Sequence, residues 1–213
     1  MILLITIILV LIFILNLITY WILFLKVKDK QNKLVKFFLK IFPVLWTISL
    51  IPIPILNSSF LNIYFPQNNS YFHEYWIYFA LLGIFFVIVG IIFANKANKV
   101  YKVKALDESS SKLITTGIFR IIRHPIYSAW GIIFLGAAII SDSFVSLIIC
   151  SLILLILEVN AIIEENLILI PKYSKTYEQY KEKTPYRIIP TPLNFLLIVI
   201  AFIIVYVGFL NII

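Results

Sequence analysis

The chain has 213 residues, of which 62% are hydrophobic and only 13% are charged, and its mean hydropathy is +1.03. A soluble domain carries about a quarter charged residues, so this composition excludes a soluble globular protein and indicates an integral membrane protein. The single cysteine, Cys150, lies inside an apolar run, which excludes an intrachain disulfide and a thiol-based metal cluster.

Six apolar runs predict the membrane-spanning helices. A helix needs roughly 20 apolar residues to cross a hydrocarbon core of about 30 Å. The fourth run has about 15 residues, or roughly 22 Å of helix, so its helix is expected either to begin earlier or to start below the membrane surface in a protein-lined site. The first run lacks a basic leader and a small-residue cleavage site, so we expect a retained span. The predicted spans are residues 2–25, 37–56, 75–94, 126–140, 144–163 and 193–213.

The positive charges predict how these spans are oriented. The chain has a net charge of +8, and six spans bring all 18 lysine and arginine residues to one side of the membrane. The opposite side carries Glu74 and Asp142. The positive-inside rule therefore predicts that the basic side is cytosolic and that both termini lie outside. This topology accounts for the charge, so no nucleic-acid partner is expected. The predicted fold class is all-α: a polytopic membrane helix bundle of about six transmembrane helices, with a short helical hairpin and a cytosolic C-terminal segment.

Arg123-His124-Pro125 stands directly before the fourth apolar run. Pro125 suits the first turn of a helix, where its missing N–H costs nothing. The helix that follows presents free backbone N–H groups and its positive dipole end to the same place. With Arg123 and His124, this makes a cationic, donor-rich corner suited to a carboxylate or phosphate. A snorkelling arginine and an interfacial histidine are the alternative interpretation.

Three acids lie at or near the end of the fifth run, where ionisable groups are expensive and usually face a protein interior. Glu158 and Glu165 are seven residues apart and share nearly the same helical face, and Asn160 lies one turn before Glu164. These acids could bind the hydroxyl or ammonium groups of a polar cofactor. Alternatively, Glu164 and Glu165 begin the cytosolic segment and meet water.

Tyrosines alternate with lysines between residues 172 and 187. Tyr173, Tyr177 and Tyr180 follow helical spacing and are expected to form one face, which would lie on the site or on the membrane surface. The chain lacks the glycine-rich signatures of soluble nucleotide-binding domains, and it has only two histidines, far apart in the sequence. No metal site is therefore expected.

Five motifs in order resemble the isoprenylcysteine carboxyl methyltransferase family and its relatives, the membrane phospholipid N-methyltransferases. They cover residues 113–190, somewhat over a third of the chain. In chain order they are Thr116-Gly117-Ile118-Phe119-Arg120, Arg123-His124-Pro125-Ile126-Tyr127, the helical hairpin ending at Glu164-Glu165, the pair Tyr177 and Tyr180, and Pro190.

Three positions depart from the family pattern. Ser174 stands where the family usually has a glycine before the first tyrosine of the pair, and Asn160-Ala161 stands where prenylcysteine enzymes tend to carry an arginine. Counted back from the tyrosines without a gap, the family's acid pair falls on Glu165 and Asn166 rather than on Glu164 and Glu165. Both assignments stay open at this point.

The resemblance implies an S-adenosyl-L-methionine-dependent methyltransferase whose lipophilic substrate enters from the bilayer at the cytosolic face. The resemblance is confined to residues 113–190, so we expect three parts: an N-terminal three-span scaffold (1–112), a methyltransferase-like cofactor-binding region (113–190) and a C-terminal transmembrane helix (191–213). Arg123 and Glu165 would be catalytic. The implied cofactor-binding residues are Arg123, His124, Tyr127, Glu164 and Glu165, with Tyr177 and Tyr180 in a lid segment.

The methyl acceptor stays open between a prenylcysteine-type carboxylate, a phospholipid amine and another lipid. A carboxylate needs no proton removed, whereas an amine must be neutral, and Glu165 could accept its proton. Two other classes remain as alternatives: a related membrane reductase that uses a nicotinamide cofactor, and a small transporter or scaffold without catalytic activity.

Overall fold

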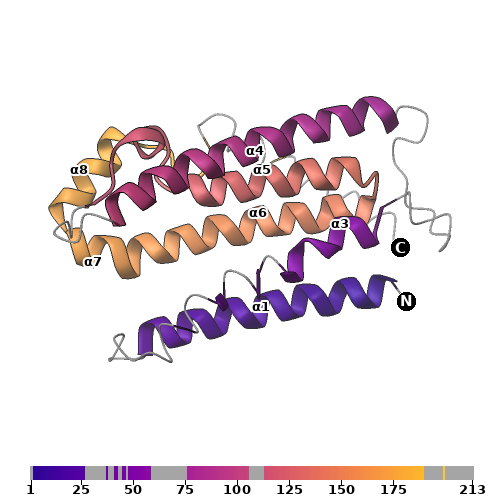
Figure 1. Ribbon diagram of the computed structural model, residues 1–213. Helices are drawn as coiled ribbons and strands as arrows, with labels where there is room; N and C mark the ends of the chain where they lie inside the picture. Colours follow the sequence, from indigo (N-terminus) through magenta and orange to yellow (C-terminus); the bar gives the residue numbers. More distant parts are fainter. Residues whose placement is uncertain are drawn as a thin grey trace. The chain divides into compact units, whose positions relative to one another are not determined.

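Every regular element that the computed structural model describes is a helix (Figure 1). The described residues are 2–26, 37, 41–42, 45–46, 48–58, 76–105, 113–189 and 199. The chain divides into two compact units, Met1–Ser70 and Tyr71–Ile213, which are treated separately below. The all-α class expected from the sequence is confirmed for these residues.

The first unit contains α1 (Ile2–Lys26) and the short α3 (Pro52–Leu56). The side-chain amide of Asn57, directly after α3, donates to the Thr6 hydroxyl of α1 over 2.7 Å, and both residues are buried. Most large apolar side chains of α1 are exposed, as expected of a helix that faces lipid. The second expected span, residues 37–56, lies partly outside the described residues.

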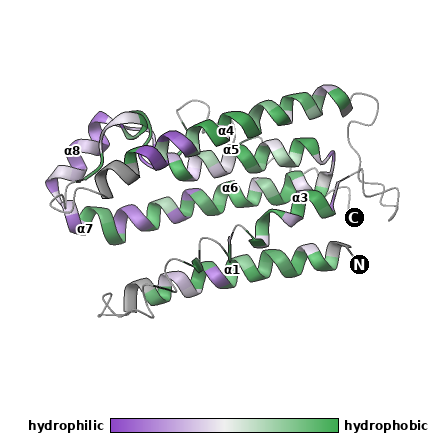
Figure 2. Ribbon diagram, viewed as in Figure 1, coloured by the Kyte–Doolittle hydropathy of each residue, from purple (hydrophilic) through white to green (hydrophobic). Residues whose placement is uncertain are grey.

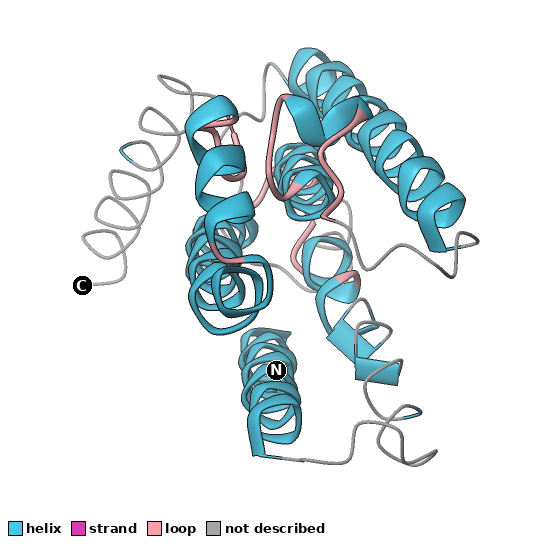
Figure 3. Ribbon diagram, turned by 90° about the vertical axis from the view of Figure 1, so that its left-hand side faces the viewer, coloured by secondary structure: helices cyan, strands magenta, loops and turns pink. Residues whose placement is uncertain are grey.

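The second unit is built on three helices: α4 (Trp76–Ala105), α5 (Pro125–Ile140) and α6 (Phe144–Glu164). α5 packs along α4 on one side and against α6 on the other (Figure 1 and Figure 3). A tight turn at residues 141–143 joins α5 to α6, which confirms the predicted helical hairpin. α4 was expected in the N-terminal scaffold, and it lies in the same unit as the hairpin.

Three helices of the described chain are long and apolar enough to cross a membrane: Leu4–Leu23, Ile77–Val100 and Val145–Tyr173. α5 is apolar but shorter. The protein is therefore an integral membrane protein with several candidate transmembrane helices. The expected sixth span, residues 193–213, falls almost entirely outside the described residues.

The fifth span continues further than expected, and this corrects the position of the acids. α6 runs directly into a π-helical turn, η4 (Glu165–Leu169), and then into α7 (Ile170–Tyr173). Glu164 and Glu165 therefore lie within a continuous helix and not at its end. The π turn immediately precedes Pro171, whose ring would clash with the carbonyl of Leu167 in a regular α-helix.

The N-terminus of α5 is covered by a distant part of the chain. The helix has 16 residues, about 24 Å, and does not begin earlier than Pro125. The backbone N–H groups of Arg123 and His124 donate to the carbonyls of Tyr186 (3.0 Å) and Arg187 (2.9 Å). The first alternative from the sequence, an earlier helix start, is therefore not observed, and protein covers the start of this short helix. Figure 2 shows that this end of the second unit, with α7 and α8 (Lys175–Lys183), is its hydrophilic end.

α4 and α5 approach closely where two glycines face each other. A Cβ on Gly136 would lie 2.5 Å from the carbonyl oxygen of Gly83, and a Cβ on Gly83 would lie 2.6 Å from that of Gly136. Backbone atoms cannot move aside without shifting a whole helix. Close packing through small residues is a general way of joining membrane helices, so this pair is expected to hold α4 against α5.

We expect Gly136→Ala to destabilise the second unit by roughly 1–3 kcal/mol, because the added methyl group would force the two helices apart. Thermal unfolding in detergent measures this as a lower melting temperature. Gly131→Ala, on the same helix, is the matched control: its Cβ would meet the flexible end of Leu154 at 2.7 Å. Equal melting temperatures for the two variants would contradict the role given to the α4–α5 contact.

Candidate functional site

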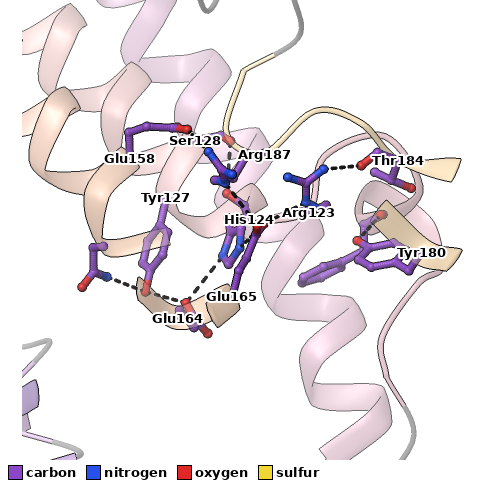
Figure 4. A network of polar contacts seen from close by, with 12 residues as sticks. Arg123, His124, Tyr127, Ser128, Glu158, Glu164, Glu165, Tyr180, Thr184 and Arg187 are labelled. Atoms are coloured by element: carbon purple, nitrogen blue, oxygen red, sulfur yellow. Dashed lines mark hydrogen bonds and ion pairs between the residues drawn. The ribbon is translucent and has the colours of Figure 1, made fainter. Parts of the chain in front are cut away.

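A network of charged and polar side chains lies at the hydrophilic end of the second unit (Figure 4). Its members come from the start of α5, from the α6–η4 helix and from the segment 184–189 that follows α8. We call it the acid–base network. It consists of Arg123, His124, Tyr127, Glu158, Asn160, Glu164, Glu165 and Arg187.

The guanidinium group of Arg123 joins the three parts of the chain. Its Nε donates to Oε1 of Glu165 over 2.8 Å. Its Nη1 donates to the carbonyls of Thr184 (2.7 Å) and Pro185 (2.8 Å). The Arg123 and Glu165 side chains are 5% and 2% exposed, so this is a buried ion pair. Such a pair is costly to break, because removing one partner leaves a buried charge without compensation.

The imidazole of His124 lies between two carboxylates. Nε2 is 3.2 Å from Oε1 of Glu165, and Nδ1 is 3.5 Å from Oε2 of Glu164. The ring stacks parallel to that of Tyr127, with 5.4 Å between the ring centroids. Burial lowers the pKa of His124, but the hydrogen bonds and charges of the two carboxylates outweigh it, so this pKa is raised above its ordinary value. The protonated, cationic form is thereby favoured.

This raised pKa predicts a pH-dependent stability. A group whose folded-state pKa is raised contributes stability that is complete below its unfolded pKa, about 6.5, and is lost as the pH rises through the folded pKa. We therefore expect the difference in melting temperature between wild type and His124→Gln to shrink as the pH rises above about 6.5. A series of thermal unfolding curves from pH 5.5 to 9 measures it. A difference that stays constant or grows would show that the carboxylates do not favour the imidazolium.

Tyr127 and Asn160 position the carboxylate of Glu164. The Tyr127 hydroxyl donates to Oε2 of Glu164 over 2.9 Å and accepts from the Asn160 side-chain amide over 2.8 Å. Glu164 is 30% exposed whereas Glu165 is 2% exposed, and Asn166 points outward. The two acids that the structure brings together are therefore Glu164 and Glu165.

Arg187 is the member of the network that the sequence did not single out. Its Nη1 forms an ion pair with Oε1 of Glu158, and its Nε lies 3.3 Å from Oε2 of Glu165. The sequence showed no arginine at Asn160 and Ala161, and the structure brings one from the segment after α8 to Glu158 and Glu165 of the same helix. The available signal was an arginine three residues before Pro190, but nothing local predicts which helix it would reach.

The two predicted lid tyrosines are buried in α8, but Tyr173 does not share their face. Tyr177 is fully buried and Tyr180 is 6% exposed, and the Tyr180 hydroxyl donates to the carbonyl of Phe119 over 2.6 Å. Burial, aided by the charge of Glu165, raises the pKa of the Tyr177 hydroxyl, which therefore stays protonated. The expected single face of three tyrosines is wrong, because the helix breaks at Ser174 between α7 and α8.

Ser174 breaks the helix in a backbone conformation that favours glycine. Its φ is 46° and its ψ is −126°. A side chain in this region costs of order 1–3 kcal/mol. We therefore expect Ser174→Gly to relieve this strain and to raise the melting temperature. The net gain should be equivalent to about 1 kcal/mol, because glycine loses more chain entropy on folding and this offsets part of the relief. Ser174→Ala, which keeps the Cβ, should leave the melting temperature near that of wild type. A destabilised glycine variant would contradict the strain.

These observations place the protein among integral membrane proteins that carry a polar site at one end of a helix bundle. The second unit is a bundle of apolar helices whose hydrophilic end holds a network of three acids, two arginines and a histidine, most of it buried. Ionisable groups buried inside a membrane protein are typical of a functional site and rare elsewhere.

The comparison with known families identifies this class more closely. Residues 74–176 match the model of the phospholipid methyltransferase family, so this part of the chain is similar to that family. The match contains α4 to α7 and the network residues from Arg123 to Glu165, and it ends before Tyr177 and Arg187.

One curated relative adds detail. The Protein-S-isoprenylcysteine O-methyltransferase of Schizosaccharomyces pombe is 36% identical over 73 residues, which is 34% of this chain and 31% of that protein. The aligned region thus spans about a third of that relative's length. No solved structure matches the chain with statistical significance.

Proposed function

We propose that the protein is a membrane methyltransferase that moves a methyl group from S-adenosyl-L-methionine to a lipophilic substrate at the cytosolic face. The observation that carries this proposal is the acid–base network. Its residues from Arg123 to Glu165 lie within the region that matches the phospholipid methyltransferase family, at the hydrophilic end of a membrane bundle. A helix does not need such a network to span a bilayer, and burying ionisable groups inside a membrane protein costs free energy.

The cytosolic location follows from charge. The last part of α4, the residues before α5 and the segment after α7 carry the basic residues of the second unit, and they meet at one end of it. Positive-inside topology assigns this end to the cytosol. Val159 and Ile162 of α6 are exposed apolar side chains within one helical turn of Glu158 and Glu164. A lipophilic substrate could therefore reach the network laterally from the bilayer.

The residues of the network fit the proposed cofactor. S-adenosyl-L-methionine supplies a methyl group on a sulfonium centre, and it carries an ammonium, a carboxylate and hydroxyl groups. Among the described residues, three buried atoms in or beside the network have no hydrogen-bond partner: Oε2 of Glu158, the Tyr177 hydroxyl and Nε of Arg187. Buried polar atoms are rarely left unpaired in native proteins. Glu158 and Glu164 would receive cationic or hydroxyl groups, and Tyr177 would donate a hydrogen bond.

In this proposal Arg123 and Glu165 act by holding the site together. Arg123 ties the segment at Thr184 and Pro185 to the helix that bears the acids. His124 and Tyr127 orient Glu165 and Glu164, and Tyr180 anchors α8 beside Phe119. Methyl transfer between aligned reactants needs orientation and exclusion of water more than acid–base chemistry, and a buried, cross-linked site supplies both.

The surroundings of Glu165 favour an acceptor that needs no base. Its carboxylate meets Arg123, His124 and Arg187, all cationic or capable of being so. A carboxylate stabilised by three such groups is a poor proton acceptor. We therefore infer a prenylcysteine-type carboxylate as the first candidate acceptor. A phospholipid amine is the second, favoured by the family of the matched domain; the partly exposed Glu164 would then take the proton.

The proposal is tested by isothermal titration of the detergent-solubilised protein with S-adenosylhomocysteine, the demethylated product. Binding at a one-to-one ratio is expected, followed by transfer of radiolabelled methyl groups to a native lipid extract. NADPH serves as the control ligand. Protection from heat by NADPH, with no binding of S-adenosylhomocysteine, would overturn the proposal in favour of a nicotinamide-dependent reductase. Binding of neither ligand would favour a transporter or scaffold.

A further inference from the structure

The two arginines of the network differ in how much of their binding capacity the protein itself uses. Arg123 is 5% exposed, and its Nε and Nη1 donate to Glu165 and to two backbone carbonyls. Its guanidinium is thus used to join the helix that bears Glu165 to the segment after α8. Arg187 is 26% exposed, and among the described residues its guanidinium forms ion pairs with the side chains of Glu158 and Glu165.

The contacts of Arg187 leave part of its guanidinium available. Nη1 is bound to Glu158, but Nε is buried without a hydrogen-bond partner among the described residues, although Oε2 of Glu165 is 3.3 Å away. Oε2 of Glu158 is likewise buried and unpaired. Among the described residues, Nε of Arg187 is therefore held only by the ion pair with Glu165, and Oε2 of Glu158 lacks a hydrogen-bond partner. Burial lowers the pKa of Arg187 and the two glutamates raise it more, so the net pKa is raised and the group stays cationic.

The backbone around Arg187 is held independently of its side chain. The carbonyls of Tyr186, Arg187 and Ile188 accept hydrogen bonds from Arg123 N–H, His124 N–H and the Ser128 hydroxyl. Three successive carbonyls are thus bound to the start of α5. The side chain is delivered to the network by this backbone docking, so it is not needed to hold the segment in position.

We propose that Arg187 is the residue that binds the anionic oxygen group, a carboxylate or a phosphate, of a ligand in the methyl-transfer reaction. This rests on the proposed function. Two ligands carry such a group: the cofactor, through its amino-acid carboxylate, and the acceptor lipid, through its own carboxylate or phosphate. A guanidinium pairs with either in a two-pronged geometry that lysine cannot reproduce. Glu158 neutralises the arginine when that group is elsewhere, and it then becomes available to a hydroxyl or ammonium group of the same ligand.

The test compares Arg187→Gln and Arg187→Lys with wild type in three measurements. These are titration with S-adenosylhomocysteine, titration with 5′-methylthioadenosine, which lacks the amino-acid part, and the KM for a native lipid extract. If the cofactor carboxylate is bound, Arg187→Gln weakens S-adenosylhomocysteine at least about tenfold and leaves 5′-methylthioadenosine unchanged. If the acceptor is bound, both titrations are unchanged and the KM rises at least about tenfold. In either case lysine should recover only part of the loss.

A purely structural role is distinguished by the double variant Glu158→Gln/Arg187→Gln, which removes both charges of the pair. If the double variant recovers wild-type affinity and KM, Arg187 only compensates Glu158 and the proposal is overturned. It is also overturned if Arg187→Gln changes neither the affinity nor the KM by more than about twofold. Failure of the wild-type protein to bind S-adenosylhomocysteine at all would instead count against the proposed function itself.

Discussion

Replacing Arg123 with methionine is expected to abolish methyl transfer and to destabilise the second unit by about 3–5 kcal/mol, the cost of breaking a buried ion pair. Methionine preserves the length and apolar volume of the arginine stem but leaves Glu165 without its closest cation. The carbonyls of Thr184 and Pro185 lose their donor as well. We therefore expect the segment after α8 to detach locally before the whole unit unfolds.

Two measurements check this. Thermal unfolding in detergent reports the loss of stability, and limited trypsin digestion reports detachment through faster cleavage after Lys183, which is exposed at the end of α8. Arg120→Met is the matched control, because Arg120 lies three residues earlier on η3 (Gly117–Arg120) with an exposed side chain. If both variants lose stability equally, the effect comes from total charge and not from the buried pair. If Arg123→Met stays resistant to trypsin, Arg123 does not hold the segment.

The sequence predicts the local features of the site well because they follow from local chemistry. Proline is favoured in the first turn of a helix, where no hydrogen bond to its nitrogen is needed. Pro125 therefore predicts that α5 begins there and that Arg123 and His124 lie at its N-terminus. A short turn joins α5 to α6, so α6 runs back alongside α5. The end of α6, which carries Glu164 and Glu165, is therefore expected near the N-terminus of α5. Composition alone was enough to predict membrane helices.

The features that the sequence missed depend on long-range structure. Arg187 reaches Glu158 only because three backbone carbonyls of its segment dock on residues 123–128, and no periodicity encodes that docking. The helix of the fifth span was also expected to end near Glu164-Glu165, yet it continues through the π turn to Tyr173. Tyr173 was grouped with Tyr177 because helical spacing assumes an unbroken helix, and Ser174 breaks it.

Exchanging Glu165 for glutamine should have an effect as large as the loss of Arg123. Glutamine has nearly the same shape but no charge, so Arg123, Arg187 and His124 would face one another with a single neutral amide between them. The side chain is 2% exposed, so water cannot compensate. We expect a loss of stability of about 3–5 kcal/mol and no detectable binding of S-adenosylhomocysteine. His124 would also lose one of its two carboxylates, so its pKa should fall and the pH-dependent stability should weaken.

Glu164→Gln is the matched comparison, one residue away on the same helix. Glu164 is 30% exposed and accepts a hydrogen bond from Tyr127, which a glutamine oxygen can also accept. Its loss should cost about 1 kcal/mol of stability or less, while S-adenosylhomocysteine binding should weaken at least about tenfold, since charge-assisted bonds are the stronger ones. Thermal unfolding and titration of both variants separate the two roles: Glu165 would govern stability and binding together, and Glu164 binding alone. Equal losses of stability would mean that Glu164 is as structural as Glu165, and the division of labour between the two acids would be wrong.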